Sequence, residues 1–496
     1  MSLISLHNVS FTYPTGNAPV FDQISFSFDT DWKTGLIGRN GKGKTTLLAL
    51  LQGKYTYSGR IEPHISVSAY PFSISDPSFL TYSILEEIAP QAQFWQFVKE
   101  LSLLQVKEDV LYQPFDTLSY GEQTKVMLAG LFLTHHDYLL IDEPTNHLDA
   151  SGREILSAYL RKQKTGYMIV SHDRVFLDQC TDHTISLNRT DISITAGSFS
   201  SWYQQYTVET RSQLSKNRQL LKDIDRLHAS SLQADQWSQA VEKTKNGTRI
   251  AGLRPDKGRI GHKAAKMMKR SIQIQKHAEK AIQEKKSLLK NVETTEQLQL
   301  HPLSFHSDPM IVFDHFTICY DRPLFHPVSL SIHPGDRIAV TGPNGCGKSS
   351  FLKALIGSDI PFTGTLKRGR NLIISYVPQD TSSLSGSLYE YADQHGIDCT
   401  LFLALLRKLG FERNLFEMDI AQYSYGQKKL TALAGSLACR AHLYIWDEPL
   451  NYIDIFVRMQ LLEMIEHCEA TILFVEHDRA FYDAVATKTI VLSEKM

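Results

Sequence analysis

The chain has 496 residues, of which 42% are hydrophobic, and this length is enough for about three globular domains. Lysine and arginine total 52 against 53 aspartate and glutamate, so the net charge of -1 excludes a protein that is basic or acidic throughout. The six cysteines form no CxxC pair, no run of about 18 apolar residues occurs, and the first ten residues lack a signal-peptide pattern. These features exclude a thiolate metal cluster and a membrane-spanning helix, and we expect a cytoplasmic protein.

The first informative element along the chain is a short apolar strand at residues 34–37, followed by the loop Gly38-Arg-Asn-Gly-Lys-Gly-Lys44-Thr45. The loop fits the pattern GxxxxGK[ST]. In such a loop the glycines let backbone N–H groups turn toward phosphate oxygens, the lysine adds positive charge, and the hydroxyl binds magnesium. The second half repeats the pattern as Gly342-Pro-Asn-Gly-Cys-Gly-Lys348-Ser349 after an apolar strand at residues 337–340. The sequence therefore predicts two nucleotide-phosphate sites.

Three further motifs follow each loop in the same order: a serine in a Ser-Tyr-Gly segment, an Asp-Glu pair after an apolar strand, and a histidine after another apolar strand. The interval from lysine to serine is 75 positions in the first half and 76 in the second, and the later intervals of 24 and 29 positions are identical in both halves. The corresponding residues are Lys44, Ser119, Glu143 and His172, then Lys348, Ser424, Glu448 and His477. This internal repetition predicts two copies of one structural unit.

These motifs resemble the Walker A, signature, Walker B, D-loop and H-loop motifs of ATP-binding cassette ATPases over nearly the whole chain. Two cassettes joined by a charged helical linker are similar to the ABC-F family, whose members act on ribosomes. The segment Asp142-Glu-Pro-Thr-Asn-His-Leu-Asp149 has the residues that are usual in this family. The segment Asp447-Glu-Pro-Leu-Asn-Tyr-Ile-Asp454 departs from them and resembles the same motif in the Lsa- and Vga-type antibiotic-resistance branch. The resemblance implies an α/β fold with two tandem P-loop nucleotide-binding domains, at residues 1–208 and 301–496, joined by a long α-helical hairpin at 209–300.

Hydrolysis of ATP spreads negative charge over the transferred phosphoryl group, so the sites need cations and a group that activates water. We expect Glu143 and Glu448 to act as general bases and His172 and His477 to reach the γ-phosphate, although a lone histidine is usually structural. Magnesium is expected at Thr45, Asp142, Ser349, Asp447 and Gln379. The residues expected to bind ATP are Tyr13, Gly38, Asn40, Gly41, Gly43, Lys44, Thr45, Thr46, Ser119, Gly121, Tyr320, Gly342, Asn344, Gly345, Gly347, Lys348, Ser349, Ser350, Gln379, Ser424 and Gly426.

Two groups within this set depend on the family resemblance. Tyr13 and Tyr320 would stack on adenine, and the alternative is that they are core aromatics of an edge strand. Each signature, beginning at Ser119 or Ser424, would complete the site of the other cassette. The chain would then be a monomer whose two cassettes pair around ATP.

The two halves differ at one position near the sites. The second half has Gln379 in Tyr376-Val-Pro-Gln379, but the corresponding segment Ala69-Tyr-Pro-Phe72 ends in phenylalanine, which cannot coordinate magnesium. We hypothesise that the site containing Lys44 turns over slowly and that the site containing Lys348 hydrolyses faster. The alternative is that Phe72 is only a packing substitution.

The charge of the chain is concentrated between the two halves. Residues 209–292 contain 20 Lys and Arg against 8 Asp and Glu. Apolar spacing predicts helices at 209–242 and 262–292, with glycines and Pro255 between them, and therefore a hairpin with a basic apex. Leu220, Ile224 and Leu227 on the first helix, and Met268, Ile272, Ile282 and Leu289 on the second, are expected to pack the two helices together.

This basic block predicts contact with a polyanion, although a solvated linker would also account for it. The expected RNA-binding residues are Lys245, Arg249, Arg254, Lys257, Arg259, Lys263, Lys266, Lys269 and Arg270. The resemblance implies that the hairpin enters the E site of the 70S ribosome, near 23S rRNA and P-site tRNA. Protection from lincosamides, pleuromutilins and streptogramin A compounds would follow.

Three other functions fit parts of the sequence. A housekeeping translation factor acting on stalled ribosomes would use the same cassettes and hairpin. The energy subunit of a transporter would need a membrane partner, which we do not expect here, and would leave the basic hairpin without a role. A DNA-repair ATPase would need a much longer helical arm.

Overall fold

The computed structural model describes residues 2–14, 19–63, 65–146, 148–187, 192–243, 257–287, 298–343 and 345–493. The chain divides into two compact units. One unit contains Met1–Trp202 and Thr295–Met496, which we call the first and second repeats, and the other is Tyr203–Thr294. None of the helices in these described ranges combines the length and apolarity that crossing a bilayer requires.

The first repeat contains an antiparallel sheet and a mostly parallel sheet. Its strands are β1 (Leu3–Phe11), β2 (Phe21–Asp29), β3 (Lys33–Gly38), β4 (Ser58–Glu62), β5 (Val67–Tyr70), β6 (Tyr138–Asp142), β7 (Tyr167–Val170), β8 (His183–Leu187) and β9 (Ile192–Ala196). Its helices are α1 (Lys44–Leu51), α2 (Thr81–Ile88), α3 (Phe94–Leu103), η1 (Glu108–Tyr112), η2 (Phe115–Thr117), α4 (Tyr120–Leu133), α5 (Ala150–Lys162) and α6 (Arg174–Cys180). The strand orders are β2-β1-β4 and β5-β6-β7-β3-β8-β9, with β9 antiparallel to β8.

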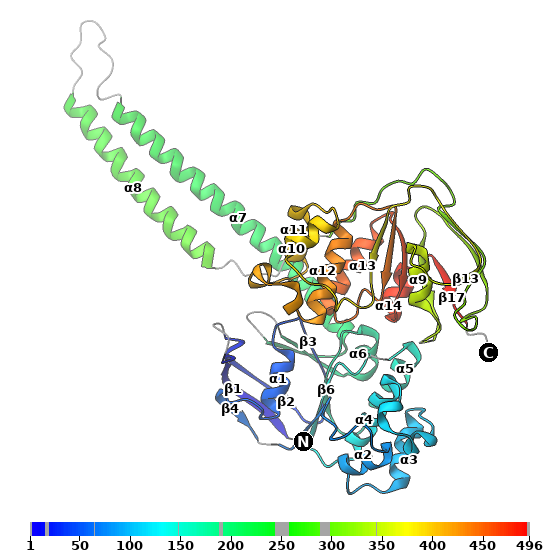
Figure 1. Ribbon diagram of the computed structural model, residues 1–496. Helices are drawn as coiled ribbons and strands as arrows, with labels where there is room; N and C mark the ends of the chain where they lie inside the picture. The colour runs from blue at the N-terminus through cyan, green and yellow to red at the C-terminus, as the bar shows by residue number, and fades with distance from the viewer. Residues whose placement is uncertain are drawn as a thin grey trace. The chain divides into compact units, whose positions relative to one another are not determined.

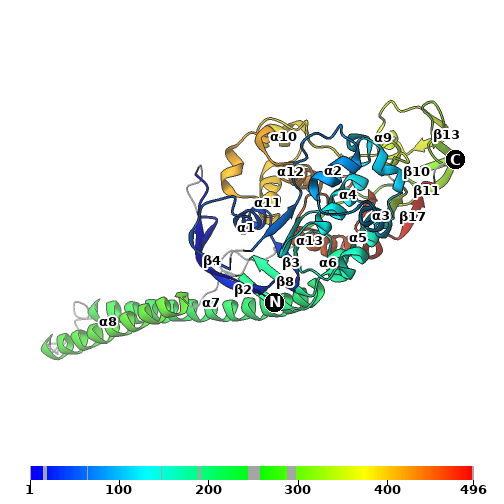
Figure 2. The same cartoon turned by 90° about the horizontal axis from the view of Figure 1, so that it is seen from below.

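The second repeat has the same plan. Its strands are β10 (Ile311–Ile318), β11 (Val328–Ile332), β12 (Arg337–Thr341), β13 (Phe362–Arg368), β14 (Ile374–Val377), β15 (Leu443–Asp447), β16 (Thr471–Val475) and β17 (Lys488–Val491). Its helices are α9 (Lys348–Ile356), α10 (Leu388–Gln394), α11 (Cys399–Lys408), η3 (Arg413–Glu417), η4 (Ile420–Gln422), α12 (Tyr425–Ala438), α13 (Ile455–Glu466) and α14 (Arg479–Val485). The strand orders are β11-β10-β13 and β14-β15-β16-β12-β17, and Figure 2 shows α10, α11 and α12 grouped together.

The strand order brings the motifs to one edge of each parallel sheet. In the first repeat β7 lies between β6 and β3, and in the second β16 lies between β15 and β12. Asp142 pairs in register with Val170, and Asp447 with Val475. Since parallel strands end at the same edge, the P-loop, the Asp-Glu pair and the histidine meet there. The expected α/β fold with two tandem nucleotide-binding domains is confirmed.

The core of each repeat lies on both faces of its parallel sheet. In the second repeat, Phe313, Phe316 and Phe351 pack between the antiparallel sheet, α9 and the parallel sheet. Trp446 and Phe474 belong to a separate buried cluster with residues of α12 and α13. Strands covered on both faces read as continuous apolar runs, which explains why β15 and β16 are apolar at nearly every position.

Two long helices dominate the other unit, α7 (Phe199–Lys243) and α8 (Lys257–Ser287). They lie side by side in Figures 1 and 2, and Lys285 Nζ on α8 lies 2.6 Å from Asp223 Oδ2 on α7. Their 45 and 31 residues correspond to lengths of about 67 and 46 Å. The predicted helical hairpin is therefore present, with different helix starts.

Both helices begin earlier than the sequence analysis predicted. The start of α7 at Phe199 is anchored by Phe199 and Trp202, which are almost completely buried. The start of α8 at Lys257 places Gly258 and Gly261 inside the helix. A glycine costs only about 1 kcal/mol within a helix, which is too little to end one of this length.

The expected packing stripe on α8 is only partly correct. Ile224 and Ile282 are buried, but Met268 and Ile272 are 49% and 45% exposed, and Leu289 lies outside the described residues. Among the α8 side chains that the structure describes, Ser271, Ala278 and Ile282 are buried. At about 100° per residue, positions 272 and 282 lie roughly 80° apart around the helix, whereas 271, 278 and 282 share one face.

Replacing Ile282 by alanine should destabilise the pairing of α7 and α8 by about 2–4 kcal/mol, because a buried branched side chain is removed. The matched control, Met268→Ala on the exposed face, should change it by less than about 0.5 kcal/mol. Hydrogen exchange of the α7 and α8 amides measures both effects. Equal exchange rates in the two variants would contradict this packing.

Candidate nucleotide-binding and hydrolysis sites

Both P-loops have the backbone that a phosphate cradle needs. Gly43 and Gly347 precede α1 and α9 with φ angles of 91° and 96°, in the left-handed region. A Cβ atom at Gly43 would lie 2.7 Å from Val20 Cγ1, so only glycine fits. The lysine of each P-loop donates a hydrogen bond to a backbone carbonyl of the same loop. Lys44 Nζ donates to Gly38 O at 2.7 Å, and Lys348 Nζ donates to Pro343 O at 2.8 Å.

The oxygen atoms beside each P-loop suit a magnesium ion. Thr45 Oγ1 donates to Asp142 Oδ2 at 3.0 Å, and Ser349 Oγ donates to Gln379 Oε1 at 3.2 Å. Burial raises the pKa of Asp142 and of Asp447, with the nearby hydroxyl of Thr45 or Ser349 opposing that effect. Among the described residues, neither buried carboxylate oxygen of Asp447 meets hydrogen-bond geometry with a partner. A hard cation would satisfy these oxygens, so the residues fit Mg²⁺.

The two glutamates that follow these aspartates share an unusual backbone. Glu143 and Glu448 have φ angles of 50° and 48°. Their N–H groups donate to the last residues of the adjacent strands, Val170 O at 2.9 Å and Val475 O at 3.0 Å. A left-handed non-glycine residue costs free energy and is concentrated at functional sites. Its occurrence at the same position in both repeats supports a functional role for both glutamates.

Each glutamate faces the histidine of its own repeat, but the two pairs differ. His172 Nε2 lies 3.1 Å from Glu143 Oε1, and His477 Nε2 lies 3.6 Å from Glu448 Oε1. Glu448 Oε2 also accepts a 2.5 Å hydrogen bond from Asn451 Nδ2. Sequence reasoning missed Asn451, whose position inside the Asp-Glu-Pro-Leu-Asn segment was the available signal.

The carboxyl groups of the two glutamates differ in their electrostatic environment. Burial raises the pKa of Glu143 to about 8, with Lys44 opposing it, and burial also lowers the pKa of His172 well below its usual value. Burial also pushes the pKa of Glu448 upward, but His477, Gln379 and Lys429 outweigh it and the net pKa is lowered. Burial therefore favours the protonated form of the carboxyl in the first repeat, whereas the neighbouring groups favour the ionised form in the second.

Phe72 does not take the place of Gln379. Its side chain lines a pocket with Ala69 of β5 and with Ile84 and Ile88 of α2. Gln379, by contrast, meets Ser349 beside the second P-loop. The segment after β14 therefore places a polar side chain, Gln379, beside the second P-loop, whereas Phe72 after β5 supplies no polar group to the first site.

The signature serines lie at helix starts. Ser119 and Ser424 are the N-cap residues of α4 and α12, and each forms a capping box with the residue three positions later. Ser119 Oγ accepts from Glu122 N, and Ser424 Oγ accepts from Gln427 N, both at 3.3 Å. A serine cap at a helix N-terminus is suited to an anion.

The two candidate adenine-stacking tyrosines occupy equivalent positions. Tyr13 OH bonds Thr46 Oγ1 at 2.8 Å, and Tyr320 OH bonds Ser350 Oγ at 3.3 Å. The Tyr13 ring also packs edge-on against Phe11 and Tyr55, with centroids 4.9 and 5.7 Å apart. Tyr320 is 54% exposed. Adenine stacking by the two tyrosines stays a prediction.

The first P-loop is in direct contact with the second repeat. Asn40 N donates to Asp454 Oδ2 at 3.1 Å, and Asn40 Nδ2 donates to Tyr452 O at 3.0 Å. Asp454 Oδ1 meanwhile caps α13 through the N–H groups of Phe456 and Val457. One carboxylate therefore fixes its own helix start and the opposite P-loop.

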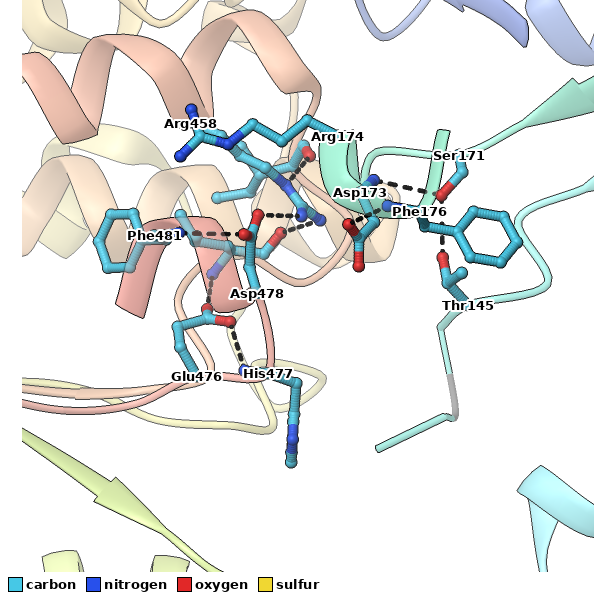
Figure 3. Close-up of polar contacts among 12 residues, drawn as sticks. Thr145, Ser171, Asp173, Arg174, Phe176, Arg458, Glu476, His477, Asp478 and Phe481 are labelled. Atoms are coloured by element: carbon cyan, nitrogen blue, oxygen red, sulfur yellow. Dashed lines mark hydrogen bonds and ion pairs between the residues drawn. The ribbon is translucent and has the colours of Figure 1, made fainter. Parts of the chain in front are cut away.

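The segments around the two histidines also differ, as Figure 3 shows. In the first repeat Ser171 Oγ bonds Thr145 Oγ1 at 3.0 Å. In the second repeat Glu476 takes the corresponding position, and its carboxylate accepts from Leu450 N at 2.7 Å and His477 N at 3.0 Å. Comparing the two histidine motifs in the sequence would have identified this residue.

Several predicted residues cannot be placed with side chains. Asn344, Lys245, Arg249 and Arg254 lie outside the described residues, and Lys257, Arg259 and Lys263 are placed in α8 by their backbone alone. The three remaining predicted RNA contacts, Lys266, Lys269 and Arg270, are exposed on α8. They neighbour the exposed side chains of Met268 and Ile272.

Comparisons with known proteins agree with this geometry. The family model described as "ABC transporter" matches residues 21–146 and 325–451. The chain is 27% identical over 544 residues to ABC transporter F family member 2 of Arabidopsis thaliana, covering 98% of this chain and 76% of that protein. It is 26% identical over 501 residues to Ribosome protection protein VmlR of Bacillus subtilis, covering 99% of this chain and 87% of that protein.

Among solved structures, the fold is similar to that of an archaeal ribosome recycling factor, aABCE1, determined in complex with the ribosomal stalk protein aP1. The TM-score is 0.59 at 19% sequence identity, and the match covers 93% of this chain and 83% of that one. The paired P-loops, the Asp-Glu pairs and the family match lead to one conclusion. The chain belongs to the ABC transporter family, as a two-cassette ATPase of the ABC-F group.

Proposed function

We propose that this protein binds the ribosome and protects it from antibiotics that act at the peptidyl-transferase centre. The drugs would be lincosamides, pleuromutilins and streptogramin A compounds. The observation that carries the proposal is the helical hairpin between the two ATPase repeats, with Lys266, Lys269 and Arg270 exposed along α8. The similarity of nearly the whole chain to a ribosome protection protein supports it.

In this proposal, regions 1–208 and 301–496 bind ATP and region 209–300 contacts RNA. ATP and Mg²⁺ would bring the cassettes together, with Glu143 and Glu448 activating water and the lysines of the P-loops holding phosphates. The closed form would hold the hairpin in the E site, beside 23S rRNA and P-site tRNA, and displace the drug. Hydrolysis would release the protein.

The second candidate is a housekeeping ABC-F translation factor that acts on stalled ribosomes without any drug. The same hairpin and cassettes would serve it. The chain is also similar to ABC transporter F family member 2, a protein whose name does not refer to resistance, and this similarity supports the second candidate. The two functions predict the same binding partner and differ only in their dependence on the antibiotic.

Growth inhibition of a susceptible Gram-positive host, with and without the gene, separates the two candidates. We expect higher inhibitory concentrations of lincomycin, tiamulin and virginiamycin M, and no change for erythromycin. The Glu143→Gln/Glu448→Gln variant should lose the effect, because ATP turnover would be blocked. If the expressed protein changes none of these concentrations while the variant still remains on ribosomes, the housekeeping function is supported instead.

A further inference from the structure

A lysine is buried beside the second ATP site, and the nucleotide-binding motifs do not include it. Lys429 lies in the first part of α12 and has no exposed surface. Its ammonium group donates to Pro378 O at 2.7 Å, to Gln379 O at 3.2 Å and to Asp447 O at 2.9 Å. A buried ammonium is costly unless its protons are all donated, and here three acceptors match three protons.

These three carbonyl groups belong to the two segments that carry the site's oxygen ligands. Gln379, whose side chain meets Ser349 Oγ, ends the segment after β14, and Asp447 ends β15. The backbone carbonyl of Gln379 also accepts a 3.1 Å hydrogen bond from the hydroxyl of Tyr425. Tyr425 is the first residue of α12, the helix that the signature serine Ser424 caps and that we call the signature helix. Lys429 therefore joins three parts of the site through backbone atoms, which do not change with side-chain rotamers.

The first repeat has a different arrangement at the corresponding place. Five positions after its signature serine is Thr124, which is uncharged. Its hydroxyl bonds Tyr70 OH at 3.1 Å and the carbonyl of Tyr120 at 3.0 Å. These bonds do not reach the end of β6, where Asp142 lies. The cross-link from the signature helix to the end of the strand is thus a property of the second repeat among the described residues.

We propose that Lys429 is a positioning residue of the second ATP site. It ties Gln379 and Asp447 to the signature helix at a fixed separation, so that their oxygen atoms are spaced for one magnesium ion. Residues that orient metal ligands from outside the coordination shell typically change metal affinity 10- to 100-fold when they are removed. Lys429 does this through main-chain carbonyls and does not touch the nucleotide.

The test uses the full-length chain with Lys44→Ala in the first P-loop, so that binding reports the second site. Affinity for a fluorescent ATP analogue is measured with Mg²⁺ and with EDTA in its place. Lys429→Met should reduce the increase in affinity that Mg²⁺ gives by about tenfold or more, while binding in EDTA stays the same. Lys429→Arg, which keeps the charge and the donors, should retain part of that increase.

Lys428→Met is the matched control. The neighbouring Lys428 is also largely buried, but its ammonium donates to Ser382 O at 2.8 Å, away from the site's ligands. This control should leave the effect of Mg²⁺ unchanged. Equal losses of affinity with Mg²⁺ and with EDTA in Lys429→Met would show a general structural role and overturn the proposal, as would no loss at all. If thermal melting shows that Lys429→Met does not fold, Lys429→Gln, which keeps two donors, is judged by the same two measurements.

Discussion

Glu448→Gln is expected to reduce ATP hydrolysis by about a hundredfold or more, as loss of a general base does, whereas Glu143→Gln should reduce it only a fewfold. A base must be ionised to accept a proton from water. The pKa of the Glu448 carboxyl is held below its usual value, whereas that of Glu143 is raised to about 8. Most turnover should therefore come from the second site.

The polar groups around the two carboxylates give the same expectation. Glu448 accepts a hydrogen bond from Asn451, and Gln379 lies beside the same site. In the first repeat Phe72 lines a pocket whose lining includes no residue of the P-loop. The first site would then mainly keep the cassettes together, and Asn40 already connects its P-loop to Asp454 and Tyr452 of the second repeat.

Single-turnover hydrolysis, with the protein in excess over ATP, measures the two variants without interference from product release. The double variant sets the background rate. Nucleotide binding by each variant serves as the control, because glutamine should preserve the fold and the P-loops. Equal defects in the two single variants would refute the asymmetry, and Phe72 would then be a packing substitution.

Much of the site could be predicted because its residues lie at strand ends and helix starts, which leave clear local patterns. Each site histidine follows an apolar strand as predicted, because β7 ends two positions before His172 and β16 two positions before His477. The signature serines Ser119 and Ser424 are the N-caps of α4 and α12, a position that favours serine. Repetition of the motifs predicted that the two halves are copies of one structural unit, and both have the same order of parallel strands around their sites.

Features that depend on distant contacts could not be predicted in the same way. The sequence shows Lys429 as one of two consecutive lysines, and only the fold places its ammonium among three carbonyl groups. The contact of Asn40 with Asp454 joins residues 414 positions apart. On α8, Met268 and Ile272 have the spacing of a buried face but are 49% and 45% exposed. The periodicity of apolar residues predicts an apolar stripe on a helix, but it does not show which residues of that stripe pack against the partner helix.

The largest effect expected for the hairpin is on RNA binding. Replacing Lys266, Lys269 and Arg270 together by glutamine should weaken association with ribosomes strongly at physiological salt, because these exposed cations would contact phosphates. Each lost phosphate contact lowers the slope of log affinity against log salt concentration by about 0.7–0.9. The triple variant should therefore have a slope smaller by about 2–3.

The matched control replaces Lys222, Lys276 and Lys280, which are also exposed on α7 and α8. It removes the same charge from the same unit, and the long-range attraction of the hairpin for a polyanion falls equally in both variants. Only local contacts differ between them. Sedimentation with ribosomes over a range of salt concentrations measures the slopes. A smaller slope in the first variant alone places the RNA contact at residues 266–270, and the same slope in both variants would mean that this part of α8 makes no phosphate contacts of its own.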